Sequence, residues 1–331
     1  MKVTVIGDGA WGTALALNML INRHDVTLWG AFPEYLEEMK KRKENFKFLP
    51  GVSLPDELHL DSILEHAVSD ADILLFATPT QFLRGVLRKL SPVFNRSVPV
   101  INVAKGIEIE SWKRISEIIS DELGEVDFID LSGPSHAEEV SRKVPTAVVA
   151  ASENQSSAEL VQKLMMNEFF RVYTSNDVVG VELGGALKNV MAIAAGILDG
   201  MQLGDNPKAA MMTRGISEMS KLGEALGGQR STFAGLSGIG DLIVTCTSGH
   251  SRNRHVGEEL GRGKSMLLIQ QEMGMVVAEG VPTARGAYTL ARQANVSTPI
   301  IDEIYQILYH QRNVNDAIRA LMSRKAKPEE D

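Results

Sequence analysis

The stretch Val3-Thr4-Val5-Ile6-Gly7-Asp8-Gly9-Ala10-Trp11-Gly12 decides the fold. Its first four residues are an apolar, β-branched run, which predicts a short strand. The glycines fit G-x-G-x-x-G and lead directly into the helix-like segment Ala14-Leu15-Ala16-Leu17. In that context the pattern is typical of dinucleotide binding, because glycine permits a tight turn and close approach to a pyrophosphate at a helix N-terminus. A purely structural turn between strand and helix is the alternative.

The first half of the chain continues to alternate strands with helices. Apolar runs predict further strands at residues 25–29, 72–77, 99–103, 128–131, 146–150 and 171–174. Strands separated by helical segments indicate βαβ units and parallel pairing. We therefore expect an α/β fold with a doubly wound, mostly parallel sheet of the Rossmann type.

After residue 175 the pattern changes to helices, and a second, all-helical domain is expected. Residues 177–321 contain no convincing strand pattern. Helical periodicity covers residues 178–198, 207–226, 253–260, 283–294, 300–309 and 314–322. A chain of 331 residues suits two domains at ~150 residues each. We assign residues 1–175 to a dinucleotide-binding domain and residues 176–331 to a helical substrate-binding and catalytic domain.

The composition of the chain argues against a nucleic-acid-binding, secreted or membrane-spanning protein. The chain has 34 Lys and Arg against 42 Asp and Glu, a net charge of −8, which argues against a nucleic-acid partner. The single cysteine, Cys246, cannot form an intramolecular disulfide, which fits a reducing cytoplasm. Gly7 interrupts the N-terminal apolar run too early for a secretory signal. No stretch approaches the ~20 apolar residues of a spanning helix. We expect a cytoplasmic protein without an integral membrane segment or a metal site.

The most informative helical stretch is Leu183-Gly184-Gly185-Ala186-Leu187-Lys188-Asn189-Val190-Met191. Lys188 and Asn189 interrupt an otherwise apolar helix, and burying an ammonium is costly unless it is paired or functional. Desolvation would lower the pKa of Lys188 toward the range useful for proton transfer near neutral pH. The alternative is a lysine that extends to the surface.

Three other polar positions or segments are candidates for the ligand site. Lys105 follows the strand at 99–103, and ligands of open α/β sheets bind beyond the carboxyl ends of strands. Asp241 lies in a glycine-rich, apolar setting and can orient a lysine. Ser251-Arg252-Asn253 gathers hydroxyl, guanidinium and amide donors, which suit a phosphate. The alternatives are an exposed loop lysine and a surface loop that ends in a helix capped by Ser251.

The segment from Ser132 to Ala137 also follows a predicted strand. Its small residues let the backbone approach a ligand. Ser135 is alternatively a helix N-cap, with Glu138 completing a capping box. His136 has no evident acidic partner, so we interpret it as a packing or rim residue rather than a proton donor.

Together these motifs closely resemble NAD(P)-dependent glycerol-3-phosphate dehydrogenase of the soluble bacterial type, over nearly the whole chain. The Lys188 and Ser251-Arg252-Asn253 segments are specific to that family, unlike the glycine pattern. The resemblance implies an oxidoreductase that interconverts dihydroxyacetone phosphate and sn-glycerol 3-phosphate by hydride transfer with NAD or NADP. It also implies supply of glycerol phosphate for phospholipid synthesis, a small-molecule phosphate substrate and, at the level of the family, a homodimer.

The resemblance also implies roles for individual residues. Lys188 would be the proton acceptor in the oxidation direction, with Lys105 and Asp241 setting its position and pKa. The residues that match substrate-binding positions are Lys105, Gly133, Ser135, Lys188, Asn189, Asp241, Ser251, Arg252 and Asn253. Those that match cofactor contacts are Gly7, Gly9, Ala10, Trp11, Gly12, Phe82, Lys105, Ala137, Arg252, Val277 and Glu279.

The choice between NAD and NADP stays open in the sequence. The second strand ends in Trp29-Gly30-Ala31-Phe32-Pro33-Glu34, without an acid or a base at the expected position. Ala31 stands where many family members carry a basic residue or an aromatic. Glu34 lies further along the chain than the position expected for the acid that binds the ribose. The missing base mildly favours NAD. The sequence also departs from the family pattern at His136, where the bacterial branch commonly has an aromatic residue. Neither difference changes the proposed proton acceptor, Lys188.

Two other functions compete with this interpretation. A β-hydroxyacid or sugar-acid dehydrogenase shares a similar two-domain plan, and Arg252 would then hold a carboxylate. A non-catalytic dinucleotide-sensing protein would need the glycine pattern but not Lys188 and Asp241 together.

Overall fold

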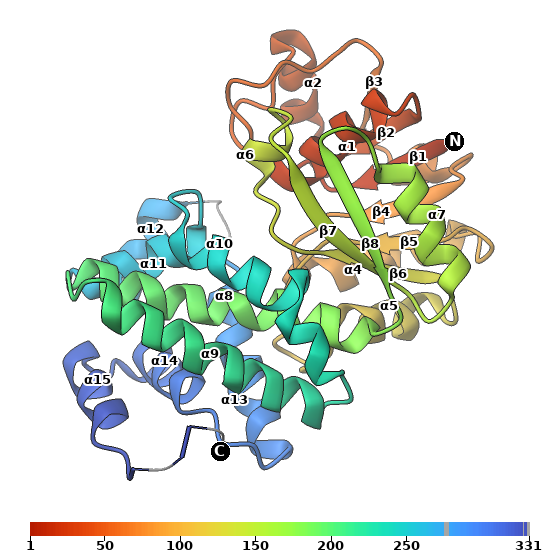
Figure 1. Cartoon of the computed structure of the whole chain (residues 1–331). Coiled ribbons are helices and arrows are strands. Elements are labelled where there is room, and N and C mark those ends of the chain that lie inside the picture. Colours follow the sequence, from red (N-terminus) through yellow and green to blue (C-terminus); the bar gives the residue numbers. More distant parts are fainter. Residues whose placement is uncertain (275–277, 327, 330–331) are drawn as a thin grey trace.

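A computed structural model describes residues 1–274, 278–326 and 328–329, and its N-terminal part forms one eight-stranded sheet (Figure 1). The strands are β1 (Lys2–Ile6), β2 (Asp25–Trp29), β3 (Leu58–Asp61), β4 (Ile73–Phe76), β5 (Val100–Asn102), β6 (Phe128–Ser132), β7 (Thr146–Ala151) and β8 (Phe170–Ser175). Their order is β3-β2-β1-β4-β5-β6-β7-β8. Only β6 and β7 pair antiparallel. The doubly wound, mostly parallel α/β sheet is confirmed.

Helices cover both faces of this sheet, because its strands are apolar on both sides. They are α1 (Ala10–Ile21), α2 (Pro33–Arg42), α3 (Leu64–Val68), α4 (Thr80–Leu90), α5 (Ile115–Leu123), α6 (Ala137–Val140) and α7 (Gln155–Met165). Val3 and Val5 of β1 pack in the same apolar cluster as Leu15 of α1. Ile6 packs in a different cluster with Leu83 of α4, as the period of two along a strand requires.

The glycine loop between β1 and α1 occupies the point where the strand order reverses, since β1 lies between β2 and β4. Ligands of open α/β sheets bind at such a point. Gly7 has φ of +127°, and a Cβ added to Gly12 would lie 2.0 Å from the carbonyl oxygen of Gly7. Both positions therefore require glycine, one for its backbone conformation and one for close packing.

The second part of the chain is helical. Its helices are α8 (Val178–Gly200), α9 (Asp205–Ala225), α10 (Asp241–Thr247), α11 (Arg252–Gly261), α12 (Met266–Met273), α13 (Gly280–Gln293), α14 (Pro299–His310) and α15 (Val314–Met322). Helix α8 is buried along nearly its whole length and packs against α9, α10, α11, α13 and α14. Figure 1 shows this helical half beside the sheet half, with α8 running through it.

Glycines bring α8 and α11 into backbone contact. A Cβ on Gly196 would lie 1.9 Å from the carbonyl oxygen of Arg254, and one on Gly257 would lie 2.0 Å from that of Ile193. No other residue fits at either position without a shift of one helix. The polar residues of α8 and of the start of α11 are therefore held close together.

Three sequence expectations need correction. Helix α8 is 23 residues long with a mean hydropathy of 1.4 over its most apolar window, so one stretch does reach the length of a spanning helix. That window is 94% buried inside the protein, as in the core helix of a folded domain. The strand β3 was missed, and α10 lies in a segment expected only to be polar and glycine-rich.

Candidate active site

Lys188 projects from the buried helix α8 into a polar cluster. Its side chain is 8% exposed, so it does not extend to the surface. Its Nζ lies 2.7 Å from Oδ1 of Asp241 and 2.7 Å from Oγ1 of Thr245, both on α10. Burial lowers the pKa of Lys188 to about 8. The positive charge of Lys105 also lowers this pKa, whereas the negative charge of Asp241 raises it. An amine with this pKa is available in both protonation states near neutral pH.

Asp241 bridges Lys188 and a second lysine from the sheet half. Lys105, in the loop after β5, places its Nζ 2.7 Å from Oδ2 of Asp241 and 2.9 Å from the carbonyl oxygen of Gly133. Burial raises the pKa of Asp241, but the two lysines outweigh burial and hold it below its usual value. The ionised carboxylate fixes both ammonium groups. The cluster carries one more positive than negative charge, which suits an oxygen that becomes negative.

The carboxyl end of β6 lies beside α8, and the segment that follows it begins there. A Cβ on Gly185 would lie 2.7 Å from Oγ of Ser132, so glycine on α8 permits this contact. Ser135 donates its hydroxyl to the carbonyl oxygen of Gly133 at 2.8 Å. The capping interpretation of Ser135 is wrong, because the N-cap of α6 is His136, which makes no side-chain cap.

A chain of amide hydrogen bonds ties the start of α11 to α8 and α13. Asn253 Nδ2 donates to Oδ1 of Asn189 at 2.9 Å, and Gly280 N–H donates to Oδ1 of Asn253 at 2.8 Å. Asn189 Nδ2 lies 3.3 Å from the carbonyl oxygen of Lys105. Ser251 Oγ accepts from the N–H of Arg254 at 3.2 Å, so it caps α11 as the alternative interpretation stated.

The start of α1 fits a pyrophosphate. Gly9 is the N-cap of α1, and the first turn contains no acidic residue. A Cβ added to Gly9 would meet no heavy atom within 4 Å. The N–H groups of the first helical turn therefore have room for an anionic group beside them, and Ala10 and Trp11 begin the helix there.

The remaining predicted cofactor contacts come from separate elements, with Glu279 at the start of α13, Phe82 in α4 and Ala137 at the start of α6. Glu279, the N-cap of α13, accepts the N–H of Thr80 on Oε1 at 2.9 Å. Burial raises the pKa of Glu279 to about 7, and its Oε2 has no hydrogen-bond partner among the described residues. Phe82 is 61% exposed and Ala137 is buried at the start of α6. Val277 lies outside the described residues.

Comparison with known proteins shows the family to which this chain belongs. The family model for the NAD-dependent glycerol-3-phosphate dehydrogenase N-terminus matches residues 2–158, and the model for the C-terminus matches residues 177–319. The chain belongs to the NAD-dependent glycerol-3-phosphate dehydrogenase family. This family uses a nicotinamide dinucleotide, in agreement with the glycine loop at the switch point of the sheet.

Individual relatives cover nearly the whole chain. The glycerol-3-phosphate dehydrogenase (NAD(P)+) of Bacillus cytotoxicus is 50% identical over 99% of this chain and 97% of its own length. That of Bacillus cereus is 49% identical over the same shares. The crystal structure of glycerol-3-phosphate dehydrogenase from Coxiella burnetii superposes with a TM-score of 0.94 at 33% identity, covering 98% of this chain and 99% of that one.

One residue of the candidate site, Thr245, was not predicted from the sequence. Thr245 lies one helical turn after Asp241 and contacts the same ammonium, a spacing that is recognisable only once α10 is known to be a helix. Burial, together with the positive charge of Lys188, lowers the pKa of His136, which the sequence indicated as a packing or rim residue. Its ring is 5.8 Å from that of His250.

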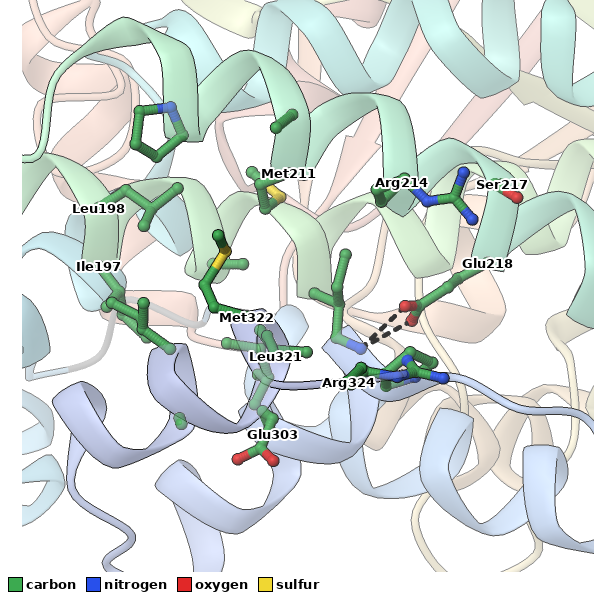
Figure 2. Close-up of a pocket in the computed structure, with 18 of the residues that line it drawn as sticks. Ile197, Leu198, Met211, Arg214, Ser217, Glu218, Glu303, Leu321, Met322 and Arg324 are labelled. Atoms are coloured by element: carbon green, nitrogen blue, oxygen red, sulfur yellow. Dashed lines mark hydrogen bonds between the residues drawn. The ribbon is translucent and has the colours of Figure 1, made fainter. Parts of the chain in front are cut away.

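A cavity of about 820 Å³ lies elsewhere in the helical half, between α8, α9, α14, α15 and the C-terminal segment (Figure 2). Its lining is mostly apolar and includes none of the predicted site residues. Glu218 and Arg214 enter it from α9 and Glu303 from α14. The cavity and the Lys188 cluster are therefore separate parts of the helical half.

Proposed function

We propose that this chain interconverts dihydroxyacetone phosphate and sn-glycerol 3-phosphate with NAD(P)H, and that Lys188 exchanges the proton on the C2 oxygen. The observation that carries the proposal is the buried contact of Lys188 with Asp241, which also holds Lys105. When bound, the reduced dinucleotide supplies the hydride that C2 of the ketone receives.

The lysine cluster supplies what the oxygen needs. As C2 becomes tetrahedral, its oxygen gains negative charge, which the ammonium of Lys188 stabilises and then protonates. In the reverse direction the neutral amine accepts the hydroxyl proton. The pKa of about 8 favours both roles, because neither form is far from accessible at neutral pH. Asp241 keeps the ammonium in place, and Lys105 adds a second positive charge.

The phosphate of the substrate would bind at the start of α11. Arg252 is the first residue of this helix and is exposed, and Asn253 follows it. A guanidinium and the partial positive charge of a helix N-terminus both favour a phosphate. Anchoring that end of a three-carbon substrate would orient its ketone toward Lys188.

The two parts of the chain divide these tasks. We assign dinucleotide binding to residues 1–175 and substrate binding and proton exchange to residues 176–331. The last strand, β8, ends at Ser175, and the helical part begins with α8 at Val178, which supports this boundary.

The buried, unpaired thiol of Cys246 fits a reducing cytoplasm, where the product would enter phospholipid synthesis. Light scattering tests the homodimer implied by the resemblance.

A turnover assay tests the proposed reaction. Purified protein should oxidise NADH or NADPH only when dihydroxyacetone phosphate is present, with little reaction on short keto acids. Comparable turnover of keto acids would favour a hydroxyacid dehydrogenase. Dinucleotide binding without any hydride transfer would favour a sensing protein.

A further inference from the structure

The strand β2 ends without a charged side chain of its own, yet a carboxylate lies beside its end. Gly30 follows the last residue of β2, and a Cβ added to it would lie 2.5 Å from Oδ2 of Asp8. Asp8 belongs to the glycine loop. A side chain at position 30 would displace this carboxylate, so glycine at position 30 leaves room for it beside the end of β2.

Hydrogen bonds hold the backbone around Asp8 on both sides. The N–H of Gly7 donates to the carbonyl oxygen of Trp29 at 3.0 Å, and Asn45 Nδ2 donates to the carbonyl oxygen of Asp8 at 2.7 Å. Asn45 is itself fully buried and accepts the hydroxyl of Tyr35 at 2.5 Å. The backbone that carries this carboxylate is therefore held in place by its neighbours.

The carboxylate of Asp8 has unused hydrogen-bonding capacity. Its Oδ2 is buried and has no hydrogen-bond partner in the described part of the chain. Burial raises the pKa of Asp8, and none of the ion pairs found among the described residues includes it. A buried acceptor without a donor is unfavourable, and a hydroxyl group of a ligand would relieve that cost.

In dinucleotide-binding folds, an acid at the end of the second strand accepts a hydrogen bond from the ribose 2′-hydroxyl. We propose that Asp8, from the glycine loop, takes this role and selects NAD over NADP. A hydroxyl donates to the carboxylate, whereas a 2′-phosphate meets a like charge at the same place. The inference rests on the dinucleotide binding in the proposed function and on none of its proton chemistry.

The neighbouring residues agree with this selection. Phe32, the N-cap of α2, is 58% exposed, and no basic residue occurs between Gly30 and Glu34. An exposed aromatic ring provides an apolar surface for an adenine but no charge for a phosphate. Glu34 is the acidic residue in the first turn of α2 and provides a matched control.

Binding measurements without substrate test the proposal. Calorimetry would compare ADP-ribose with its 2′-phosphorylated form, and NADH with NADPH, on the full chain. Wild type should bind the forms without the 2′-phosphate at least about tenfold more tightly. Asp8→Asn keeps the size but removes the charge, and Asp8→Ala removes the group altogether; both should bring the ratio to within about threefold. Glu34→Gln should leave the ratio unchanged.

The outcomes separate the proposal from the assigned function. Equal binding of the two forms by wild type, or an unchanged ratio in both folded Asp8 variants, overturns the role of Asp8. A ratio that changes only in Glu34→Gln transfers the role to Glu34. A chain that binds no dinucleotide at all contradicts the proposed function and this inference together. Because the glycine pattern accepts any residue at position 8, the variants should fold, which circular dichroism would verify.

Discussion

At the scale of single residues, the protonation of Lys188 sets the pH dependence of both reaction directions. Reduction of the ketone needs the ammonium, so its kcat/KM should be constant below about pH 8 and fall about tenfold per pH unit above it. Oxidation of the alcohol needs the neutral amine and should show the opposite slope. Initial rates in both directions across this range test the assignment; slopes of the same sign would contradict it.

Asp241 should control that pKa. Its carboxylate stabilises the ammonium of Lys188, so Asp241→Asn should lower the pKa further and move the inflection to lower pH. The same change leaves two lysines without their carboxylate, and we expect it to destabilise the fold by roughly 3–5 kcal/mol. The pH profile of the folded variant is the measurement.

Thr245→Val is the matched control for Asp241→Asn. It removes one hydrogen bond to Lys188 Nζ and retains the charge. Its inflection should stay near that of wild type. If Asp241→Asn shifts the profile no more than Thr245→Val does, Asp241 acts only structurally.

At the scale of elements, a carboxylate on α9 stabilises the start of α14 (Figure 2). Glu218 accepts the N–H of Ile300 at 2.9 and 3.0 Å and that of Ile301 at 3.2 Å. Burial raises its pKa to about 7 despite these bonds. The stability it contributes is therefore complete below its unfolded pKa near 4.5 and is lost as pH rises to about 7, by roughly 3 kcal/mol at most.

Glu218→Gln removes this titration and keeps an oxygen that can accept the N–H groups. Urea unfolding of both proteins at several pH values measures the effect. Relative to the variant, wild type should lose stability between about pH 4.5 and pH 7. A difference that does not change with pH would show that Glu218 titrates normally.

The glycine contact between α8 and α11 makes a second prediction at this scale. Gly196→Ala would place a methyl group against the carbonyl oxygen of Arg254 and should destabilise the protein by roughly 1–3 kcal/mol. Gly85→Ala in α4 meets no atom within 4 Å and should stabilise it by up to about 1 kcal/mol. Urea denaturation compares the two. Equal effects would mean that α8 and α11 do not need their close approach.

Elements with a clear period were predictable from the sequence, and those without one were not. The β-branched run of β1 correctly predicted a strand, and the long apolar stretch of α8 correctly predicted a helix. The strand β3 is short and lies at the sheet edge, so Leu58-His59-Leu60-Asp61 provides little apolar signal. Helix α10 follows glycines that mask its start, which hid the spacing of Asp241 and Thr245.

At the scale of the whole molecule, polar contacts join the sheet half to the helical half. Glu182 of α8 accepts the N–H of Ser116 at 2.7 Å, and Asp241 accepts from Lys105 across the same junction. The burial of Lys188 was predictable, because an ammonium in an apolar helix needs a partner. The sequence offered Asp241 only as a candidate for that partner. Residues that pair in this cluster lie far apart in the sequence and meet only when both halves have folded together.

Loss of the Lys188 amine tests most directly whether this residue exchanges the proton. On one preparation of Lys188→Met, the affinity for NADH and the turnover of dihydroxyacetone phosphate would both be measured, with the exposed Lys163→Met of α7 as control. Turnover by Lys188→Met should fall about 10³-fold while its NADH affinity stays within about threefold of wild type, and the control should behave as wild type. Turnover by Lys188→Met close to that of wild type would contradict this role of Lys188.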